Sequence, residues 1–180
     1  KLFGIDLLKN FNYPYFSRDI AEFWRRWHIS LSSWFRDYLY IPLGGSQGGM
    51  WMKVRNTFII FLVSGFWHGA NWTFIIWGLL NAIYFLPLLL QNTNRSNMGD
   101  IEMGWNFNSV KTILNILGTF ALTTIAWIFF RAKSISEAVG YLQKMVTDLH
   151  FDSQYLSNER YSFELVLLVL VFVFVEWFNR

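Results

Sequence analysis

The fold of this chain is decided by the stretch Asn56-Thr-Phe-Ile-Ile-Phe-Leu-Val-Ser-Gly-Phe-Trp-His-Gly-Ala-Asn-Trp-Thr-Phe-Ile-Ile-Trp-Gly-Leu-Leu80. It belongs to a run of 39 residues between Arg55 and Arg95 in which only His68 can change its charge near neutral pH. A run this apolar is typical of a membrane segment, where an ionisable side chain is costly and indicates a functional site. Because imidazole titrates close to neutral pH, His68 is a candidate general base.

The composition supports a membrane protein. Of the 180 residues, 54% are hydrophobic, 21% are aromatic and only 15% are charged, whereas soluble domains carry about 25% charged residues. The absence of cysteine excludes a cysteine nucleophile, disulfides and thiolate-bound metal within this stretch. The net charge of +3 gives no indication of nucleic-acid binding. The start, Lys1-Leu-Phe-Gly-Ile-Asp6, lacks a signal-peptide pattern, so we expect the chain to begin inside a larger protein.

Residues 1–55 hold eight of the fifteen basic residues and are expected to lie at the membrane surface. Ser17 is the predicted N-cap of a helix, with Asp19 in the first turn. Apolar and aromatic side chains then recur at helical spacing among arginines, at Phe23, Trp24, Trp27 and Leu31. This pattern indicates a helix lying in the membrane interface. A proline and four glycines over 42–49 end it, so we predict interfacial or re-entrant helices on the cytoplasmic side without a full span.

Residues 56–90 are predicted to form a broken helix. The first arm, Asn56 to Trp67, has 12 residues, which is about 18 Å of helix and too short for a bilayer core of ~30 Å. The second arm, Trp72 to Leu90, is long enough. The break is expected within Gly65–Asn71, because irregular backbone at membrane depth is tolerated inside protein or beside a water-filled cavity.

Two further spans are predicted at 110–130 and 163–178. The loop 131–162 carries more basic residues than the loop 91–109. The positive-inside rule therefore predicts 1–55 and 131–162 on the cytoplasmic side and 91–109 outside. The expected fold is all-α, a polytopic membrane protein with about three spanning helices plus interfacial or re-entrant helices.

The three histidines differ in their surroundings. His150 lies in a polar stretch and is expected in a solvated loop. His28 either faces lipid headgroups or serves the same site as His68. His68 is either a neutral structural histidine held by neighbouring helices or a catalytic base. Asn71 could hold one of its nitrogens if the turn brings it back.

A catalytic triad cannot be assembled locally, because no Asp or Glu lies between Asp37 and Asp100. Ser64 precedes His68 by four residues but lacks the strand–turn setting of a nucleophile elbow. The simplest mechanism needs no protein nucleophile: the histidine takes a proton from an acceptor hydroxyl, which attacks an activated acyl donor directly.

Three motifs carry a resemblance to a known family. They are Phe23-Trp-Arg-Arg-Trp-His-Ile-Ser-Leu-Ser-Ser-Trp-Phe-Arg-Asp-Tyr-Leu-Tyr-Ile-Pro-Leu-Gly-Gly45, Phe66-Trp-His-Gly-Ala-Asn-Trp-Thr-Phe74 and Trp127-Ile-Phe-Phe-Arg-Ala132. Together they closely resemble the membrane-bound O-acyltransferase (MBOAT) family, in its bacterial branch of alginate O-acetylation and teichoic acid D-alanylation membrane proteins. The similarity covers roughly residues 10–135. Residues 1–180 resemble the C-terminal portion of a single membrane domain of that family, which implies that the isolated stretch is inactive alone.

The resemblance implies the roles of individual residues. It makes His68 the catalytic histidine and places His28 on the path from the cytoplasmic donor side. The residues expected to support the substrate channel are Trp67, Asn71, Arg25, Arg26 and Trp27.

The resemblance also implies the reaction and its partners. It implies transfer of an acyl group, with acetyl favoured, to hydroxyls of an extracytoplasmic polysaccharide in a bacterial inner membrane. The donor substrate would be acetyl-CoA or an acyl-carrier-protein thioester, with no bound cofactor and no metal. Expected partners are membrane lipid, the acyl donor or carrier protein inside, and the polysaccharide or a periplasmic acetyltransferase outside, with no nucleic acid.

Three alternatives remain open from the residues alone. The chain could be a proton-coupled transporter or channel subunit with His68 as a proton relay. It could bind haem or a metal ion through His28 and His68. It could also be a structural membrane subunit, which would leave a buried titratable histidine without a purpose.

Overall fold

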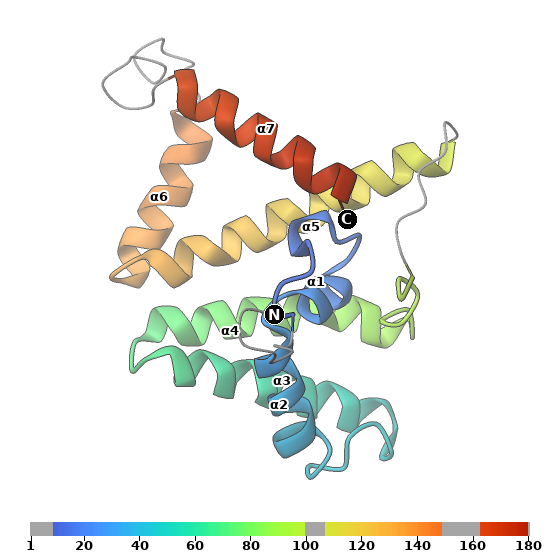
Figure 1. Cartoon of the computed structure of the whole chain (residues 1–180). Helices are drawn as coiled ribbons and strands as arrows, with labels where there is room; N and C mark the ends of the chain where they lie inside the picture. The colour runs from blue at the N-terminus through green and yellow to red at the C-terminus, as the bar shows by residue number, and fades with distance from the viewer. Residues whose placement is uncertain (1–8, 100–106, 149–162, 180) are drawn as a thin grey trace, which may run out of the picture. The chain divides into compact units, whose positions relative to one another are not determined.

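The computed structural model describes residues 9–99, 107–148 and 163–179, which contain helices and no strand (Figure 1). The chain divides into two compact units, Lys1–Ala138 and Val139–Arg180, and the functional residues predicted above lie in the first. The helical elements are η1 (Pro14–Phe16), α1 (Ile20–Arg26), α2 (Ile29–Phe35), the π-turn η2 (Arg36–Tyr40), α3 (Gly49–His68), α4 (Trp72–Leu90), α5 (Phe107–Arg131), α6 (Ile135–Thr147) and α7 (Phe163–Asn179).

The helices α3 and α4 form a tight antiparallel hairpin at the centre of the first unit (Figure 1). Their backbones approach closely at two glycines. A Cβ atom on Gly65 would overlap the backbone carbonyl of Phe74, and one on Gly78 would overlap that of Phe61. Small residues that let helix backbones touch are the usual device for helix packing in membranes. The two glycines therefore set the register of the hairpin.

The predicted break between the two arms is confirmed. α3 ends at His68, α4 begins at Trp72, and Gly69 adopts φ +151°, a backbone conformation that other residues rarely take. The side chain of Asn71 then caps α4 by accepting a hydrogen bond of 3.1 Å from the Thr73 N–H. The predicted length of the first arm is wrong, because α3 has 20 residues and starts at Gly49.

This longer first arm changes the predicted orientation. α3 and α4 have 20 and 19 residues, or about 30 Å each, so the start of α3 and the end of α4 lie at the same end of the hairpin. The Arg25 guanidinium accordingly donates to the backbone carbonyls of Asn94 (2.9 Å) and Asn97 (3.0 Å). Groups in such contact cannot lie on opposite sides of a bilayer core of ~30 Å. The prediction that 1–55 and 91–109 face opposite sides is therefore wrong for the segments in contact. The prediction that 1–55 and 131–162 share one side is also wrong for residues near Lys133, whose carbonyl accepts from Asn71 at the other end of the hairpin.

The aromatic, arginine-rich segment forms two short helices instead of one. Ser17 is not the N-cap, because its hydroxyl donates to the Pro14 carbonyl (2.6 Å). Asp19 caps α1 by accepting from the Glu22 N–H (2.7 Å). The chain leaves the helix after Arg26, and α2 starts beyond His28, whose backbone is left-handed (φ 44°, ψ 58°). Neither helix is long enough to span a membrane, since each has seven residues.

Two described helices are long and apolar enough to cross a membrane, at Trp72–Leu90 and Val110–Arg131. They correspond to the second arm of the broken helix and to the span predicted at 110–130. α7 covers the region predicted as a third span, but its 17 residues extend only about 25 Å. The sequence did not predict α6, a separate helix of 13 residues that follows α5.

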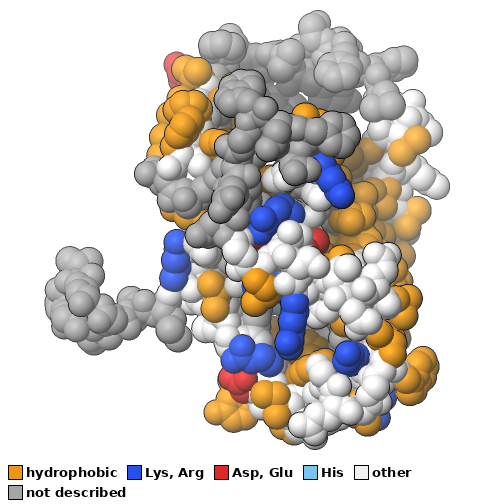
Figure 2. Space-filling view, turned by 90° about the vertical axis from the view of Figure 1, so that its right-hand side faces the viewer, with side chains coloured by type: hydrophobic (Ala, Val, Ile, Leu, Met, Phe, Trp, Pro, Cys, Tyr) orange, Lys and Arg blue, Asp and Glu red, His pale blue; other side chains and the backbone are white. Residues whose placement is uncertain are grey.

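Basic side chains gather at one end of the hairpin. Figure 2 looks onto the right-hand side of Figure 1, where α3 begins and α4 ends, and shows several Lys and Arg side chains on that face. Hydrophobic side chains extend along the edge beside them. This end of the hairpin is thus polar and basic, whereas His68 lies at the other end of α3.

Candidate active site

A cavity of about 410 Å³ lies inside the first unit, between α1, α2, η2, α3, α4 and α5. Its volume is in the range of ligand-binding pockets. Most of its lining is aromatic or aliphatic. The polar residues that line it are His28, Ser32, Arg36, Tyr40, Ser46, Thr57, Ser64, His68, Asn94 and Arg95.

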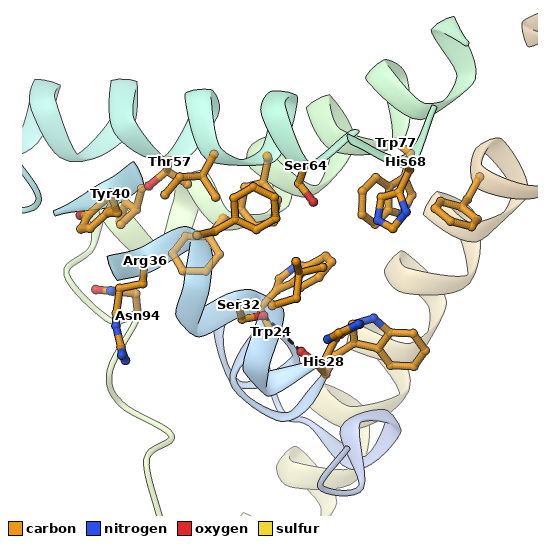
Figure 3. Close-up of a pocket in the computed structure, with 18 of the residues that line it drawn as sticks. Trp24, His28, Ser32, Arg36, Tyr40, Thr57, Ser64, His68, Trp77 and Asn94 are labelled. Carbon is orange, nitrogen blue, oxygen red and sulfur yellow. Dashed lines mark hydrogen bonds between the residues drawn. The ribbon is translucent and has the colours of Figure 1, made fainter. Parts of the chain in front are cut away.

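The cavity has two chemically different ends (Figure 3). Arg36, Tyr40 and Asn94 lie together at one end, near the start of α3. His68 and Trp77 lie at the other end. The side chain of Ser64 points into the space between these ends. A molecule bound along the cavity would therefore contact polar and cationic side chains at one end. At the other end it would contact aromatic rings and a histidine.

His68 is held by aromatic rings and not by hydrogen bonds. Its ring lies 5.0 Å from the Phe130 ring and 5.2 Å from the Trp77 ring, both in edge-on contacts. Neither imidazole nitrogen has a hydrogen-bond partner among the described residues. The amide of Asn71 is used elsewhere, because it donates to the Lys133 carbonyl (3.1 Å). A half-buried imidazole with a free nitrogen on a cavity wall can accept a proton from a bound hydroxyl.

His28 reaches the same cavity from the junction of α1 and α2. Its left-handed backbone is secured by Asn10, whose carbonyl accepts from the Ile29 N–H (2.9 Å) and whose side chain accepts from the Ser30 N–H (3.0 Å). The Nδ1 atom of His28 is buried without a hydrogen-bond partner. An unfavourable backbone conformation held by its surroundings is often found at a functional position. The fold therefore places both histidines, far apart in the sequence, on one cavity.

Charged residues in and just before α1 form an ion-pair network, and one of them reaches the cavity wall. Glu22 is 1% exposed and binds the guanidinium groups of Arg18 (3.0 Å) and Arg26 (2.9 Å). Burial raises the pKa of Glu22, but the hydrogen bonds from Arg18 and the positive charges of Arg18 and Arg26 outweigh it, so this pKa lies below its ordinary value. Arg25 holds the carbonyl of Asn94, next to Arg95 on the cavity wall.

The predicted site residues therefore have different positions. His68, His28 and Trp27 line the cavity. Trp67 is 60% exposed and lies outside the lining, as do Asn71, Arg25 and Arg26. Of these, only Arg25 bonds to a lining residue, Asn94, whereas Asn71 bonds to Lys133 and Arg26 to Glu22, which lie outside the lining.

Sequence reasoning did not assign several lining residues to the site. Ser64 was set aside as a nucleophile, yet it lies one turn before His68 on the same face of α3 and lines the cavity. Its side chain is nearly buried and has no hydrogen-bond partner among the described residues. The contributions of Trp127 and Phe130 in α5, and of Arg95 in the segment after α4, follow only from the tertiary fold. Within the described part of the chain, no three His, Cys, Asp or Glu side chains lie close enough to hold a metal ion.

Comparison with known proteins agrees with these motifs. Residues 2–130 match the family model of the membrane-bound O-acyltransferases. The peptidoglycan O-acetyltransferase of Helicobacter pylori is 45% identical over 144 residues, which is 80% of this chain and 26% of that protein. The probable alginate O-acetylase AlgI of Pseudomonas aeruginosa is 43% identical over 140 residues, 76% of this chain and 24% of that protein.

A more distant relative is the teichoic acid D-alanyltransferase of Bacillus subtilis. It is 34% identical over 140 residues, which cover 73% of this chain and 34% of that protein. The matched part of this chain thus spans between a quarter and a third of the length of these relatives. The family model matches most of the residues, including His28 and His68, the two histidines that line the cavity. The chain therefore belongs to the membrane-bound O-acyltransferase family.

Proposed function

We propose that this chain carries the acyl-transfer centre of a membrane O-acyltransferase, with His68 as the general base. The observation that supports this proposal best is the position of His68, on the wall of a cavity of about 410 Å³ with no hydrogen-bond partner among the described residues for either nitrogen. A base of this kind must reach the proton that it removes and must not be held by another group.

The reaction proposed at His68 is direct acyl transfer from a thioester. An unprotonated nitrogen of His68 takes the proton of an acceptor hydroxyl while the oxygen attacks the thioester carbonyl carbon. A C–O bond forms and the C–S bond breaks. The imidazolium then returns the proton to the departing thiolate, which leaves an ester and a free thiol. This sequence uses no protein nucleophile, and His68 ends in the state in which it started.

The two ends of the cavity suggest how the substrates approach. Arg36, Arg95 and Asn94 line the polar end, on the same side as the basic face in Figure 2. By the positive-inside rule this end faces the cytoplasm. A thioester donor, acetyl-CoA or an acyl carrier protein, would enter there. The acceptor hydroxyl would approach His68 from the opposite end of the α3–α4 hairpin, on the extracytoplasmic side.

The relatives favour acetyl as the transferred group. Those named for O-acetylation of peptidoglycan and alginate are 45% and 43% identical to this chain, against 34% for the one named for D-alanyl transfer. We therefore propose a multi-pass protein of a bacterial inner membrane that O-acetylates an extracytoplasmic polysaccharide. Its partners would be membrane lipid, a donor on the cytoplasmic side and the polymer or a periplasmic acetyltransferase outside.

The test is His68→Ala in the full-length protein, expressed in a strain that lacks the native copy. Loss of a general base typically costs ~10²–10⁴-fold in rate, so ester-linked acetate released from the polymer by mild base should fall to background. A matched control is Phe66→Leu, since Phe66 lies on the same turn of α3 but is 68% exposed and outside the cavity lining. Both variants should accumulate in the membrane at the wild-type level.

Wild-type acetylation by His68→Ala would refute the assignment. The alternative of a proton relay predicts a different phenotype, in which His68→Ala abolishes a proton-driven flux in vesicles. A relay normally needs a chain of ionisable groups, and among the described residues that line this cavity none is Asp or Glu. The structure therefore supports acyl transfer better than proton relay.

A further inference from the structure

α6 carries an apolar stripe along its whole length. Its members recur at the spacing of one face of a helix, and they are Ile135, Ala138, Val139, Leu142, Met145 and Val146. Val139 is 40% exposed and Val146 is 74% exposed, whereas Ala138, near the start of the helix, is fully buried. The opposite face contains Glu137, Lys144 and Thr147, all exposed. A short helix with one apolar and one polar face is suited to a boundary between water and an apolar phase.

Hydrogen bonds between neighbouring residues fix where α6 begins, so α6 is a helix separate from α5. The Ser134 hydroxyl accepts a hydrogen bond from the Glu137 N–H (3.2 Å), and the Glu137 carboxylate accepts one from the Lys133 N–H (2.8 Å). Such reciprocal bonds resemble a capping box, which fixes where a helix begins.

The connection to α5 limits where α6 can lie. The candidate span Val110–Arg131 ends four residues before Ile135, and four residues reach at most about 14 Å. α6 therefore begins close to the level at which α5 leaves the bilayer. Its 13 residues extend about 20 Å, too short to cross a core of ~30 Å. Arg131, Lys133 and Lys144 supply basic groups suited to phosphate headgroups.

We propose that α6 is a membrane-surface helix, with its apolar stripe inserted among the lipid acyl chains and its polar face in water. The stripe thus contacts the phospholipid bilayer and not a protein partner. The cap at Ser134, the short link to α5 and the amphipathic pattern all support this arrangement. It goes beyond acyl transfer, because it assigns an interaction surface that the reaction does not require.

The test uses single cysteines, since the chain has none of its own. Val139→Cys, Val146→Cys and Thr147→Cys are made in the full-length protein, freed of any other cysteine and carrying a bimane label, in phosphatidylcholine vesicles. Thr147→Cys is the matched control, because Thr147 adjoins Val146 but lies about 100° further around the helix. Quenching is measured with a nitroxide on the lipid acyl chain and with aqueous iodide.

The proposal predicts that the lipid nitroxide quenches the labels at 139 and 146 at least about threefold more than the label at 147. The reason is that the apolar face of a surface helix enters the region of the lipid acyl chains. Iodide should show the reverse order. Strong iodide quenching at all three positions would mean a solvated helix and would overturn the proposal. Labels at 139 and 146 that neither quencher reaches would mean that protein covers the stripe, which would overturn it equally.

Discussion

Gly65 of α3 lies directly against the backbone carbonyl of Phe74 in α4, with no space between them for a Cβ atom. Gly78 repeats this contact in the opposite direction, against the carbonyl of Phe61. Together the two contacts hold the hairpin in one register, because a shift of either helix would separate both. Ser64 and His68 lie on the α3 side of this hairpin, so the glycines also position the cavity wall.

The first prediction concerns these two contacts. Gly65→Ala and Gly78→Ala should each destabilise the full-length protein by about 1–3 kcal/mol, the usual cost of overpacking. Acyl transfer should fall as well, because the hairpin must open near His68. Thermal unfolding in detergent measures the first effect and ester formation measures the second.

Gly118→Ala is the control for this prediction. Gly118 lies in the middle of α5, and apart from the backbone of its own helix no described atom lies within 4 Å of the position that a Cβ would take. Alanine is the better helix former by ~1 kcal/mol, so this change should be neutral or stabilising. Equal melting temperatures for Gly65→Ala and Gly118→Ala would show that close helix packing at Gly65 is not important.

The second prediction separates the ring of His28 from its backbone. Asn tolerates the left-handed conformation better than Ala does, so His28→Asn should be more stable than His28→Ala by roughly 0.5–1 kcal/mol. Both variants remove the imidazole and should reduce acyl transfer, though less than His68→Ala does. Wild-type activity in His28→Asn would show that only the backbone conformation at this position matters.

The third prediction concerns Ser64, whose hydroxyl faces the cavity one turn before His68 (Figure 3). If this hydroxyl only donates a hydrogen bond to a substrate, Ser64→Ala should lower kcat/KM by about 3- to 10-fold, equivalent to one hydrogen bond. A loss as complete as that of His68→Ala, together with an acyl-enzyme detected by mass spectrometry in the wild type, would instead identify Ser64 as a nucleophile.

The fourth prediction concerns Glu22, whose pKa in the folded protein is lowered by Arg18 and Arg26 despite its burial. Because the pKa of Glu22 is lower in the folded state than in the unfolded state, its ionised form stabilises the fold at pH values above the unfolded-state pKa of ~4.3. This stabilisation is lost as the pH falls through the folded-state pKa. Glu22→Gln should cost roughly 3 kcal/mol near neutral pH, the scale for removing one partner of a buried ion pair.

The pH dependence of unfolding checks this prediction. Melting temperatures in detergent from about pH 7 down to pH 3 should fall more steeply for the wild type than for Glu22→Gln, so that the difference narrows in acid. Parallel curves for the two proteins would show that Glu22 does not contribute through its charge. Asp37→Asn is a matched control, because the Arg36–Asp37 pair is largely exposed, with the two side chains 61% and 46% accessible, and such pairs contribute little.

Local features of the sequence were enough to predict the helical class and the break, and to single out His68 as a candidate. Only glycine readily adopts the backbone of Gly69, and a polar cap such as Asn71 is a recognisable helix start. An isolated imidazole in a long apolar run stands out without any structure. The same reasoning failed at Ser17, because a hydroxyl that can cap a helix can also bond to Pro14, and only the folded backbone decides between them.

The tertiary structure alone decided which segments lie at the same end of the α3–α4 hairpin and which residues share the cavity. The sequence itself determined an apolar helical chain with a glycine-flanked histidine, because these properties reside in single residues and their neighbours. It did not determine that α3 extends back to Gly49, that Arg25 reaches Asn94, or that His28 and His68 line one cavity. These relationships depend on long-range packing of helices, and no local pattern records which faces of distant helices meet.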